Sequence, residues 1–244
     1  MKNHKLISKA FAVCCVFAMA STSFGAFVQL DVVDGRAHHQ GDSNTSYNNN
    51  LNGNFANVLE GDGLDTSADP TDPNTWTHDD SWQRGWQGQN LRQGWIIADF
   101  GSAQSLGNMY IWNENEVGNR GMATIDIFYT DAATVPNSGV GAFDFTAAGW
   151  SKFNAQPLAL PAGTSSPTQG VNGVFDLAGT SARYVAIQAV TDNGFGRNRL
   201  GLAEIVFAEA AEAAEAAPSV PEPATATLAL LGLGGLMVRR RRNA

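Results

Sequence analysis

The chain has 244 residues, of which 43% are hydrophobic and 16% are charged. Seven of its 15 basic residues are Lys2, Lys5, Lys9 and the four arginines at 239–242, so the segment between carries 8 basic against 23 acidic residues, a net charge of about −15. This charge excludes nucleic acid as a partner class, because such binding needs Lys and Arg to neutralise phosphates, whereas divalent cations and neutral sugars remain compatible with it.

Residues 1–26 have the pattern of a secretory signal peptide. Three lysines precede an apolar run at 10–20, and small residues follow it up to Ala26. The apolar run is too short to span a bilayer permanently. We therefore expect export of the chain and removal of this segment, with cleavage either after Ala20 or near Gly25 and Ala26.

Both cysteines, Cys14 and Cys15, lie inside the expected signal peptide, and no lipoprotein-type sequence precedes them. The exported chain would then have no thiol. This excludes disulfides, cysteine-ligated metals and a cysteine nucleophile, so stability must come from core packing, with help from a hard metal ion if one binds.

Residues 27–207 form one segment of domain size, in which short β-prone runs alternate with Gly, Asn, Asp and Pro clusters. We predict strands at 27–33, 95–100, 109–113, 124–130, 150–154, 174–177, 184–190 and 202–207. About eight strands and no amphipathic helix indicate an all-β fold, a β-sandwich. Residues 41–80 are polar and are expected to form a long loop.

After the domain, residues 208–219 are rich in Ala, Glu and Pro and are expected to be a linker. Residues 224–238 carry no charge and precede four arginines. Fifteen helical residues cover about 22 Å of a hydrocarbon core roughly 30 Å thick, a gap that snorkelling arginines and local thinning can close. The positive-inside rule places the arginines in the cytoplasm and the domain outside the inner membrane.

Residues 220–244 resemble the PEP-CTERM sorting signal: Pro221, Glu222 and Pro223 come first, then the apolar helix, then the arginines. The resemblance implies recognition by an exosortase-type membrane protease that cuts near this motif. The protein would be anchored transiently in the inner membrane and then passed to the cell envelope or the extracellular matrix. The alternative interpretation is an ordinary C-terminal membrane anchor.

Several segments of the domain resemble, in order, the discoidin or F5/8 type C family of galactose-binding-like domains. They are the Trp-Ile-Ile-Ala-Asp-Phe-Gly run at 95–101, the strand at 106–112, Ala-Arg-Tyr-Val-Ala-Ile at 182–187 and Leu-Ala-Glu-Ile at 202–205. The resemblance implies a jelly-roll β-sandwich and, as in many carbohydrate-binding modules, a non-catalytic sugar site.

Members of this family often hold Ca²⁺ with a loop carboxylate, backbone carbonyls and a Glu of the last strand. The corresponding residues here are Glu60, Asp62 and Glu204. Ca²⁺ takes six to eight oxygen ligands, and the neighbouring glycines let a short loop curl so that oxygens converge. A structural calcium site and a solvated acidic loop are both compatible with this pattern.

A sugar site needs an aromatic face for the apolar side of a pyranose and planar polar groups for its hydroxyls. Aromatic and basic residues of this kind gather in three expected loops, which in jelly rolls meet at one end. The candidates are Trp76, Trp82, Arg84, Trp86, Arg120 and Arg197. Each tryptophan could equally pack in the core.

Enzyme motifs are absent from the sequence: it has no Gly-x-Ser-x-Gly elbow, no His-Glu-x-x-His zinc motif and no phosphate loop. Paired acids of a glycosidase cannot be recognised from sequence, because their separation in space defines them. We therefore expect an exported protein that binds glycan or exopolysaccharide without catalysis. The alternatives are a structural matrix or biofilm protein that makes protein contacts without a sugar site, and a hydrolase.

Overall fold

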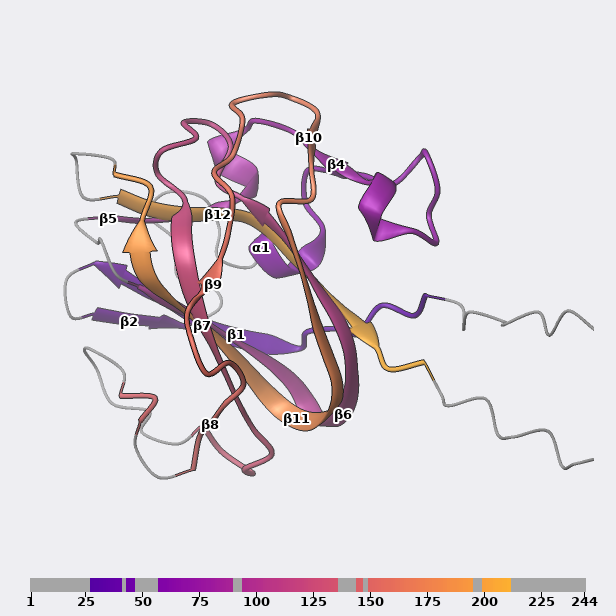
Figure 1. Cartoon of the computed structure of the whole chain (residues 1–244), viewed down its shortest axis with the longest axis vertical. Coiled ribbons are helices and arrows are strands. Elements are labelled where there is room, and N and C mark those ends of the chain that lie inside the picture. Colours follow the sequence, from indigo (N-terminus) through magenta and orange to yellow (C-terminus); the bar gives the residue numbers. More distant parts are fainter. Residues whose placement is uncertain are drawn as a thin grey trace, which may run out of the picture.

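A computed structural model describes residues 27–40, 43–46, 57–89, 94–135, 144–146, 149–194 and 199–211 (Figure 1). The expected signal peptide at 1–26 and the sorting segment with its apolar helix at 224–238 lie outside these residues. Within the described part, no helix combines the length and the apolar character that a membrane span requires.

The described part is built almost entirely of strands, which confirms the all-β prediction. The elements in chain order are β1 (Asp34–Gln40), β2 (Ser43–Ser46), α1 (Asn57–Glu60), β3 (Leu64–Asp65), η1 (Pro73–Thr75), β4 (Thr77–His78), η2 (Trp82–Arg84), β5 (Trp86–Gln89), β6 (Trp95–Asn113), β7 (Met122–Thr130), β8 (Ser151–Lys152), β9 (Leu158–Ala159), β10 (Gln169–Gly170), β11 (Gly173–Asp192) and β12 (Arg199–Glu209). The helical elements η1 and η2 are short 3₁₀ turns.

Two long antiparallel strands, β6 and β11, pair with each other along nearly their whole length and hold the fold together (Figure 1). The first half of β6 also pairs with β1, and the second half of β11 pairs with β7. The second half of β6 pairs instead with β12, which pairs with β5. The same two strands therefore belong to two layers, one with β1 and β7 and one with β12 and β5.

A bend in each long strand makes this sharing possible. In β6 the pairing with β11 is interrupted at 100–103, where Gly101 takes a φ of +76° that a side chain disfavours. In β11 the pairing with β6 is interrupted at 177–179. Residues of both halves of β6 belong to one buried cluster, Ile96 from the first half and Ile111 from the second. The halves thus fold over a common core.

Each layer also carries a smaller apolar cluster on its outer face, because side chains alternate between the two faces of a strand. Trp95 and Ile97 of β6 pack there with Phe145. Tyr110 and Trp112, near the other end of β6, pack on the opposite layer with Trp76. Both sides of the sheet strands are thus buried over part of their length.

The structure differs from the expected strands in several respects. Strands β1 and β5 were not predicted, and the strand expected at 150–154 is reduced to Ser151–Lys152. The expected strand at 27–33 is an extended segment with one bridge, from Gln29 to Ala208, and pairing with β6 begins only at Asp34. Its aromatic residue Phe27 packs edge-on against Trp76 instead. The expected pairs of strands at 95–100 and 109–113, and at 174–177 and 184–190, are continuous, because pairing resumes after each bend.

The segment 41–80, expected to be a long loop, is partly ordered by short elements. Helix α1 lies against β12, and the two-residue strands β3, β4 and β10 form a small separate sheet. Strand β12 also runs to Glu209, two residues beyond the expected domain boundary at 207. The N-terminal segment stays beside this end, since the amide of Glu209 donates to the carbonyl of Val28.

Candidate functional site

Four connecting segments meet at one end of the layers, as the sugar-site hypothesis requires. They are the segment 78–87, the β6–β7 connection, the β9–β11 connection and the start of β12. Asn115 donates through Nδ2 to the carbonyl oxygen of Asp79 at 2.5 Å. Gly201 donates its amide to the carbonyl of Arg120 at 3.0 Å, which ties the start of β12 to the β6–β7 connection.

Asn113, the last residue of β6, holds this end together. Its Nδ2 donates to the carbonyls of Met122 and Pro161 at 2.7 and 2.8 Å. Its Oδ1 accepts from the amide of Met122, and its own carbonyl accepts from the side chain of Gln169 at 2.8 Å. A fully buried amide with this many partners fixes the positions of the loops around it.

The end of the layers where these four segments meet is called the loop end below. Two ion pairs present planar charged groups there. Arg84 pairs with Asp79 at 2.6 Å, and the Arg84 side chain is 55% exposed. Arg120 pairs with Glu116 at 2.5 Å, with the Arg120 side chain more enclosed. Guanidinium and carboxylate groups supply the donors and acceptors that sugar hydroxyls need, so these pairs are suited to bracket a sugar ring.

Glu114 lies beneath these pairs and is almost completely buried. Its Oε1 accepts from Nε2 of Gln87 at 2.9 Å, and the same Nε2 donates to Glu116 at 3.0 Å. Burial raises the pKa of Glu114 to about 7, although the amide of Val117 and the charge of Arg120 act to lower it. The loop end therefore contains a carboxyl group that changes charge near neutral pH.

Two of the predicted sugar contacts need correction. Trp86 is 2% exposed within the main core, and Trp76 is 3% exposed, stacked on Trp112 with its Nε1 donating to the carbonyl of Asp69 at 2.7 Å. Neither ring has a face on which a pyranose could stack. Both tryptophans are structural, because the apolar area that suits a sugar also suits the core.

The other predicted sugar contacts are divided between described and undescribed residues. Arg84 and Arg120 both lie at the loop end. Trp82 is part of η2 beside Arg84, but its side chain lies outside the described part, as does all of Arg197.

The three predicted metal ligands come from α1, from the turn that follows it and from β12. Glu204 is 0% exposed, while Glu60 and Asp62 are exposed. Burial raises the pKa of Glu204 well above its ordinary value, the amides of Ile205 and Gly61 lower it, and the charges of Asp62 and Glu60 raise it further.

Glu204 is also incompletely satisfied. Its Oε1 accepts from the amide of Ile205 at 3.2 Å, while its Oε2 meets no hydrogen-bond donor in the described part of the chain. A buried carboxylate oxygen without a partner is costly to the fold. A bound cation beside Oε2 would supply the missing interaction.

The turn that carries Asp62 packs against His78, which is fully buried. The ring nitrogens of His78 lie 2.9 Å from the carbonyl oxygen of Asp62 and 2.7 Å from that of Asp79. Gly63 takes a φ of +93°, and a Cβ there would lie 2.8 Å from the His78 ring. Gly63 is therefore required both for the turn and for the close approach of the ring.

The donor set decides which ion would fit. No group of three or more His, Cys, Asp or Glu side chains in the described residues is arranged as a metal centre by itself. Backbone carbonyls would have to complete the coordination around Glu204 and the turn. Hard oxygen ligands from carboxylates and carbonyls match Ca²⁺ and do not match Zn²⁺, which prefers His and Cys.

Sequence reasoning singled out the loop containing Glu114 but not the role of Gln87 or Glu116. The spacing of Glu116 and Arg120, four residues apart with opposite charge, is the one signal that could have indicated their pairing. Nothing in the sequence links Gln87 to Glu114, because their 27-residue separation is bridged only by the tertiary fold.

Comparison with known proteins gives one sequence match and a set of structural similarities. Residues 219–242 match the PEP-CTERM protein-sorting motif. No curated protein matches the chain in sequence.

The structural similarities are to small modules at low sequence identity. A fucose binding module of Streptococcus pneumoniae, SpX-3, is 16% identical, with 74% of this chain and 96% of that chain covered and a TM-score of 0.43. Another Streptococcus pneumoniae fucose binding module is 11% identical, with 75% and 96% covered and a TM-score of 0.45. The family 32 carbohydrate-binding module of Streptococcus pneumoniae EndoD is 12% identical, with 75% and 99% covered and a TM-score of 0.44.

Proposed function

We propose that this protein is exported and binds glycan or exopolysaccharide, without catalysis, at the loop end of a discoidin-like jelly-roll domain. The observation that carries the proposal is the convergence of Arg84 with Asp79 and of Arg120 with Glu116 at one end of the layers. Trp82 and Arg197 would complete the site from the neighbouring segments, with Trp82 as the aromatic platform.

The acidic character of the chain supports a neutral sugar as the ligand at this end. The guanidiniums of Arg84 and Arg120 are each paired with a carboxylate, so each pair presents donors and acceptors with little net charge. Sugar hydroxyls both donate and accept, which makes such pairs suitable partners. The Asn113 network keeps the loops in place before a ligand arrives, which lowers the entropy cost of binding.

As a second part of the proposal, Ca²⁺ binds between Glu204 and the turn containing Glu60 and Asp62. The partnerless Oε2 of Glu204 and the conformation of Gly63 support this assignment. The ion would be structural: it would neutralise a buried carboxylate and fix the turn against β12.

The C-terminal motif supports the third part of the proposal, which concerns destination. The match at 219–242 includes Pro221, Glu222 and Pro223. We infer processing near this motif by an exosortase-type membrane protease, transient anchoring in the inner membrane through 224–238, and delivery to the cell envelope or the extracellular space.

The experiment that tests the sugar site is binding of the full chain to a panel of glycans and exopolysaccharides, with the Arg84→Gln and Trp82→Ala variants alongside. Each variant should lower the affinity for the best ligand at least about tenfold, since a charged hydrogen bond or a stacked aromatic contributes more than about 1 kcal/mol. Lys152→Gln is the matched control, because Lys152 forms a comparable 2.8 Å ion pair with Asp126 on the β7 and β8 strands.

Three results would contradict the proposal. Glycan binding that persists in both loop-end variants would place the sugar site elsewhere. Absence of binding to every glycan tested, by protein that retains its melting transition, would reject sugar binding and favour the structural matrix alternative. Turnover of a polysaccharide by the purified chain would reject the non-catalytic assignment.

A further inference from the structure

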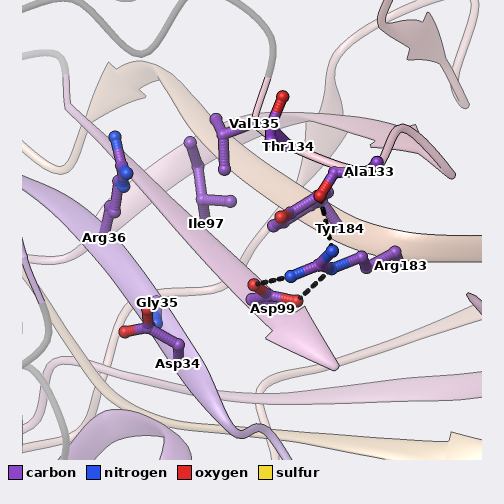
Figure 2. Close-up of a pocket in the computed structure, with 10 residues that line it drawn as sticks. All are labelled: Asp34, Gly35, Arg36, Ile97, Asp99, Ala133, Thr134, Val135, Arg183 and Tyr184. Carbon is purple, nitrogen blue, oxygen red and sulfur yellow. Dashed lines mark hydrogen bonds and ion pairs between the residues drawn. The ribbon is translucent and has the colours of Figure 1, made fainter. Parts of the chain in front are cut away.

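A small polar cavity lies away from the loop end. It is bordered by β1, the first half of β6, the segment after β7 and the second half of β11 (Figure 2). Its volume is about 230 Å³. This equals about seven or eight water molecules at roughly 30 Å³ each and falls below the roughly 300 to 1,000 Å³ of drug-sized ligand sites. The cavity therefore has room for one small molecule or one sugar unit.

One side of the cavity is held rigidly by Arg183. Its Nε and Nη2 donate to the two carboxylate oxygens of Asp99 at 2.9 and 3.0 Å, and its Nη1 donates to the carbonyl of Ala133 at 2.5 Å (Figure 2). The guanidinium also lies over the ring of Tyr184, 4.8 Å from its centroid. This side is thus preorganised, and Arg183 is fully engaged.

The opposite side of the cavity carries a second arginine. Arg36 of β1 forms no ion pair with any described residue, and its side chain borders the cavity across from Tyr184 (Figure 2). Its charge acts on the Tyr184 hydroxyl: burial and then Asp99 raise the pKa of Tyr184, while Arg183 and Arg36 lower it. Arg36 and Tyr184 both line the cavity, so a ligand that fills it would meet both side chains.

The remaining lining sets the chemistry of the ligand. Asp34 and Asp99 offer carboxylate oxygens that accept from hydroxyl groups, and the Tyr184 phenol can donate. Ile97 and Val135 supply an apolar wall (Figure 2). No described aromatic ring exposes its face there, since Tyr184 is covered by Arg183. The site needs a ligand with one anionic group and several hydroxyls.

We propose that this cavity is a second ligand site, distinct from the loop end, and that it takes one hexuronate unit with its carboxylate on Arg36. A guanidinium binds a carboxylate through two parallel hydrogen bonds, a geometry that the ammonium of a lysine cannot reproduce. The hydroxyls of the unit then face Asp34, Asp99 and Tyr184, and the less polar face of its ring lies along Ile97 and Val135.

The charge of the chain limits which uronates can bind. The exported segment carries about −15 net, which repels a dense polyanion, although this repulsion is screened beyond about 10 Å at 0.1 M salt. A single uronate, or one flanked by neutral sugars, avoids most of the repulsion. The inference shares with the proposed function only the premise that the ligand is a sugar, and it rests on other residues.

The test is amide chemical-shift mapping by NMR on the full chain, titrated separately with methyl glucuronoside, methyl glucoside and acetate. We expect methyl glucuronoside to shift the amides of Arg36, Ala133 and Tyr184, with clearly weaker effects from the other two probes. Arg36→Gln should raise the dissociation constant for methyl glucuronoside about tenfold or more. The dissociation constant of Arg36→Lys should lie between those of the unmodified chain and Arg36→Gln. Lys152→Gln, which removes an ion pair with Asp126 and does not line the cavity, should leave the dissociation constant unchanged.

Three outcomes of this titration would overturn the assignment. Equal shifts with methyl glucoside would show that Arg36 does not select a carboxylate, and equal shifts with acetate would show that the sugar ring contributes nothing. Unchanged affinity in Arg36→Gln would place the uronate elsewhere. If these amides respond while glycan binding at the loop end fails, the cavity stands and the proposed loop-end function falls. The reverse result rejects the cavity alone.

Discussion

Two buried carboxylates lie beside β12, and they are held in different ways. Glu114 accepts from Gln87 and from the amide of Val117, and an arginine lies close by. Glu204 has one weak amide partner for Oε1 and no described partner for Oε2, with two further carboxylates nearby. Burial is the largest cause of the raised pKa in both glutamates, whereas the donors around each carboxyl group determine whether it needs an external ligand.

The largest expected effect is that of Ca²⁺ on stability. If the ion binds at Glu204, 1 mM Ca²⁺ should stabilise the chain by about 3 to 4 kcal/mol for a dissociation constant in the micromolar range, which raises the melting temperature by roughly 10 °C. Glu204→Gln should abolish this response, and a chelator should do the same in the unmodified chain. Differential scanning calorimetry measures both.

The matched control is Glu114→Gln, which should keep the full response to Ca²⁺. Without calcium, Glu204→Gln should be at least as stable as the unmodified chain at neutral pH, because the substitution removes a buried acid that lacks a partner. If the calcium response persists in Glu204→Gln, the ion does not bind at Glu204. The two glutamates would then not differ in their need for an external ligand.

The second effect is the pH dependence due to Glu114. Its folded pKa of about 7 exceeds the ordinary value of 4.5, so the folded state retains a proton that the unfolded state releases between these values. Stability from this group is complete below about pH 4.5, falls as pH rises to about 7, and is then constant; the total is about 3 kcal/mol. Urea unfolding at pH 5 and pH 8 measures the difference.

Glu114→Gln should remove most of this pH dependence, because the amide is neutral throughout and its oxygen can still accept from Gln87. The comparison is between the slopes of stability against pH in the variant and in the unmodified chain. An unchanged slope in Glu114→Gln would assign the titration to another group.

The third effect tests the turn beside Glu204. Gly63→Ala places a Cβ 2.8 Å from the His78 ring at a φ of +93°, and we expect a loss of about 2 to 3 kcal/mol together with weaker calcium binding. Gly179→Ala is the matched control, since its φ is +84° with nothing within 4 Å of the added Cβ. It should cost only about 1 kcal/mol. Equal losses in thermal unfolding would exclude the contact with His78.

The smallest effect on stability is expected at the loop end. Arg84→Gln breaks an exposed ion pair, which typically contributes less than about 1 kcal/mol. Its melting temperature should therefore stay within about 2 °C of the unmodified chain while its glycan affinity falls. A large drop in melting temperature would mean that Arg84 has a structural role, and the affinity change would then carry no information about the sugar.

Much of the fold followed from local patterns. The runs at 95–100, 124–130 and 202–207 alternate or concentrate apolar residues in a way that suits buried strands, and all three are strands. The prediction of a strand at 27–33 was wrong. The segment contributes Phe27 to an outer apolar cluster and does not pair as a strand of the sheet. A short apolar run cannot by itself distinguish these two uses.

The candidate site was only partly predictable. The acidic candidates for the metal site and the tryptophan candidates for the sugar site had different outcomes. Glu60, Asp62 and Glu204 were named from a resemblance, and their role as a metal site stays a prediction, because the described residues contain no group of three or more such side chains arranged to hold an ion. Trp76 and Trp86 were named because aromatic side chains suit sugars, yet their burial makes them structural. Composition reports which chemistry a side chain offers and cannot report whether its face reaches solvent.

The sequence by itself determined the all-β class and the C-terminal sorting motif, because both depend on the order of residues over short stretches. The tertiary structure decided which polar groups are buried, which loops meet and which arginines line the cavity. Glu114 and Gln87 are 27 residues apart, Asp99 and Arg183 are 84 apart, and Arg36 faces Tyr184 across two strands. Burial and pairing at such separations arise only when distant strands pack, so no local pattern encodes them.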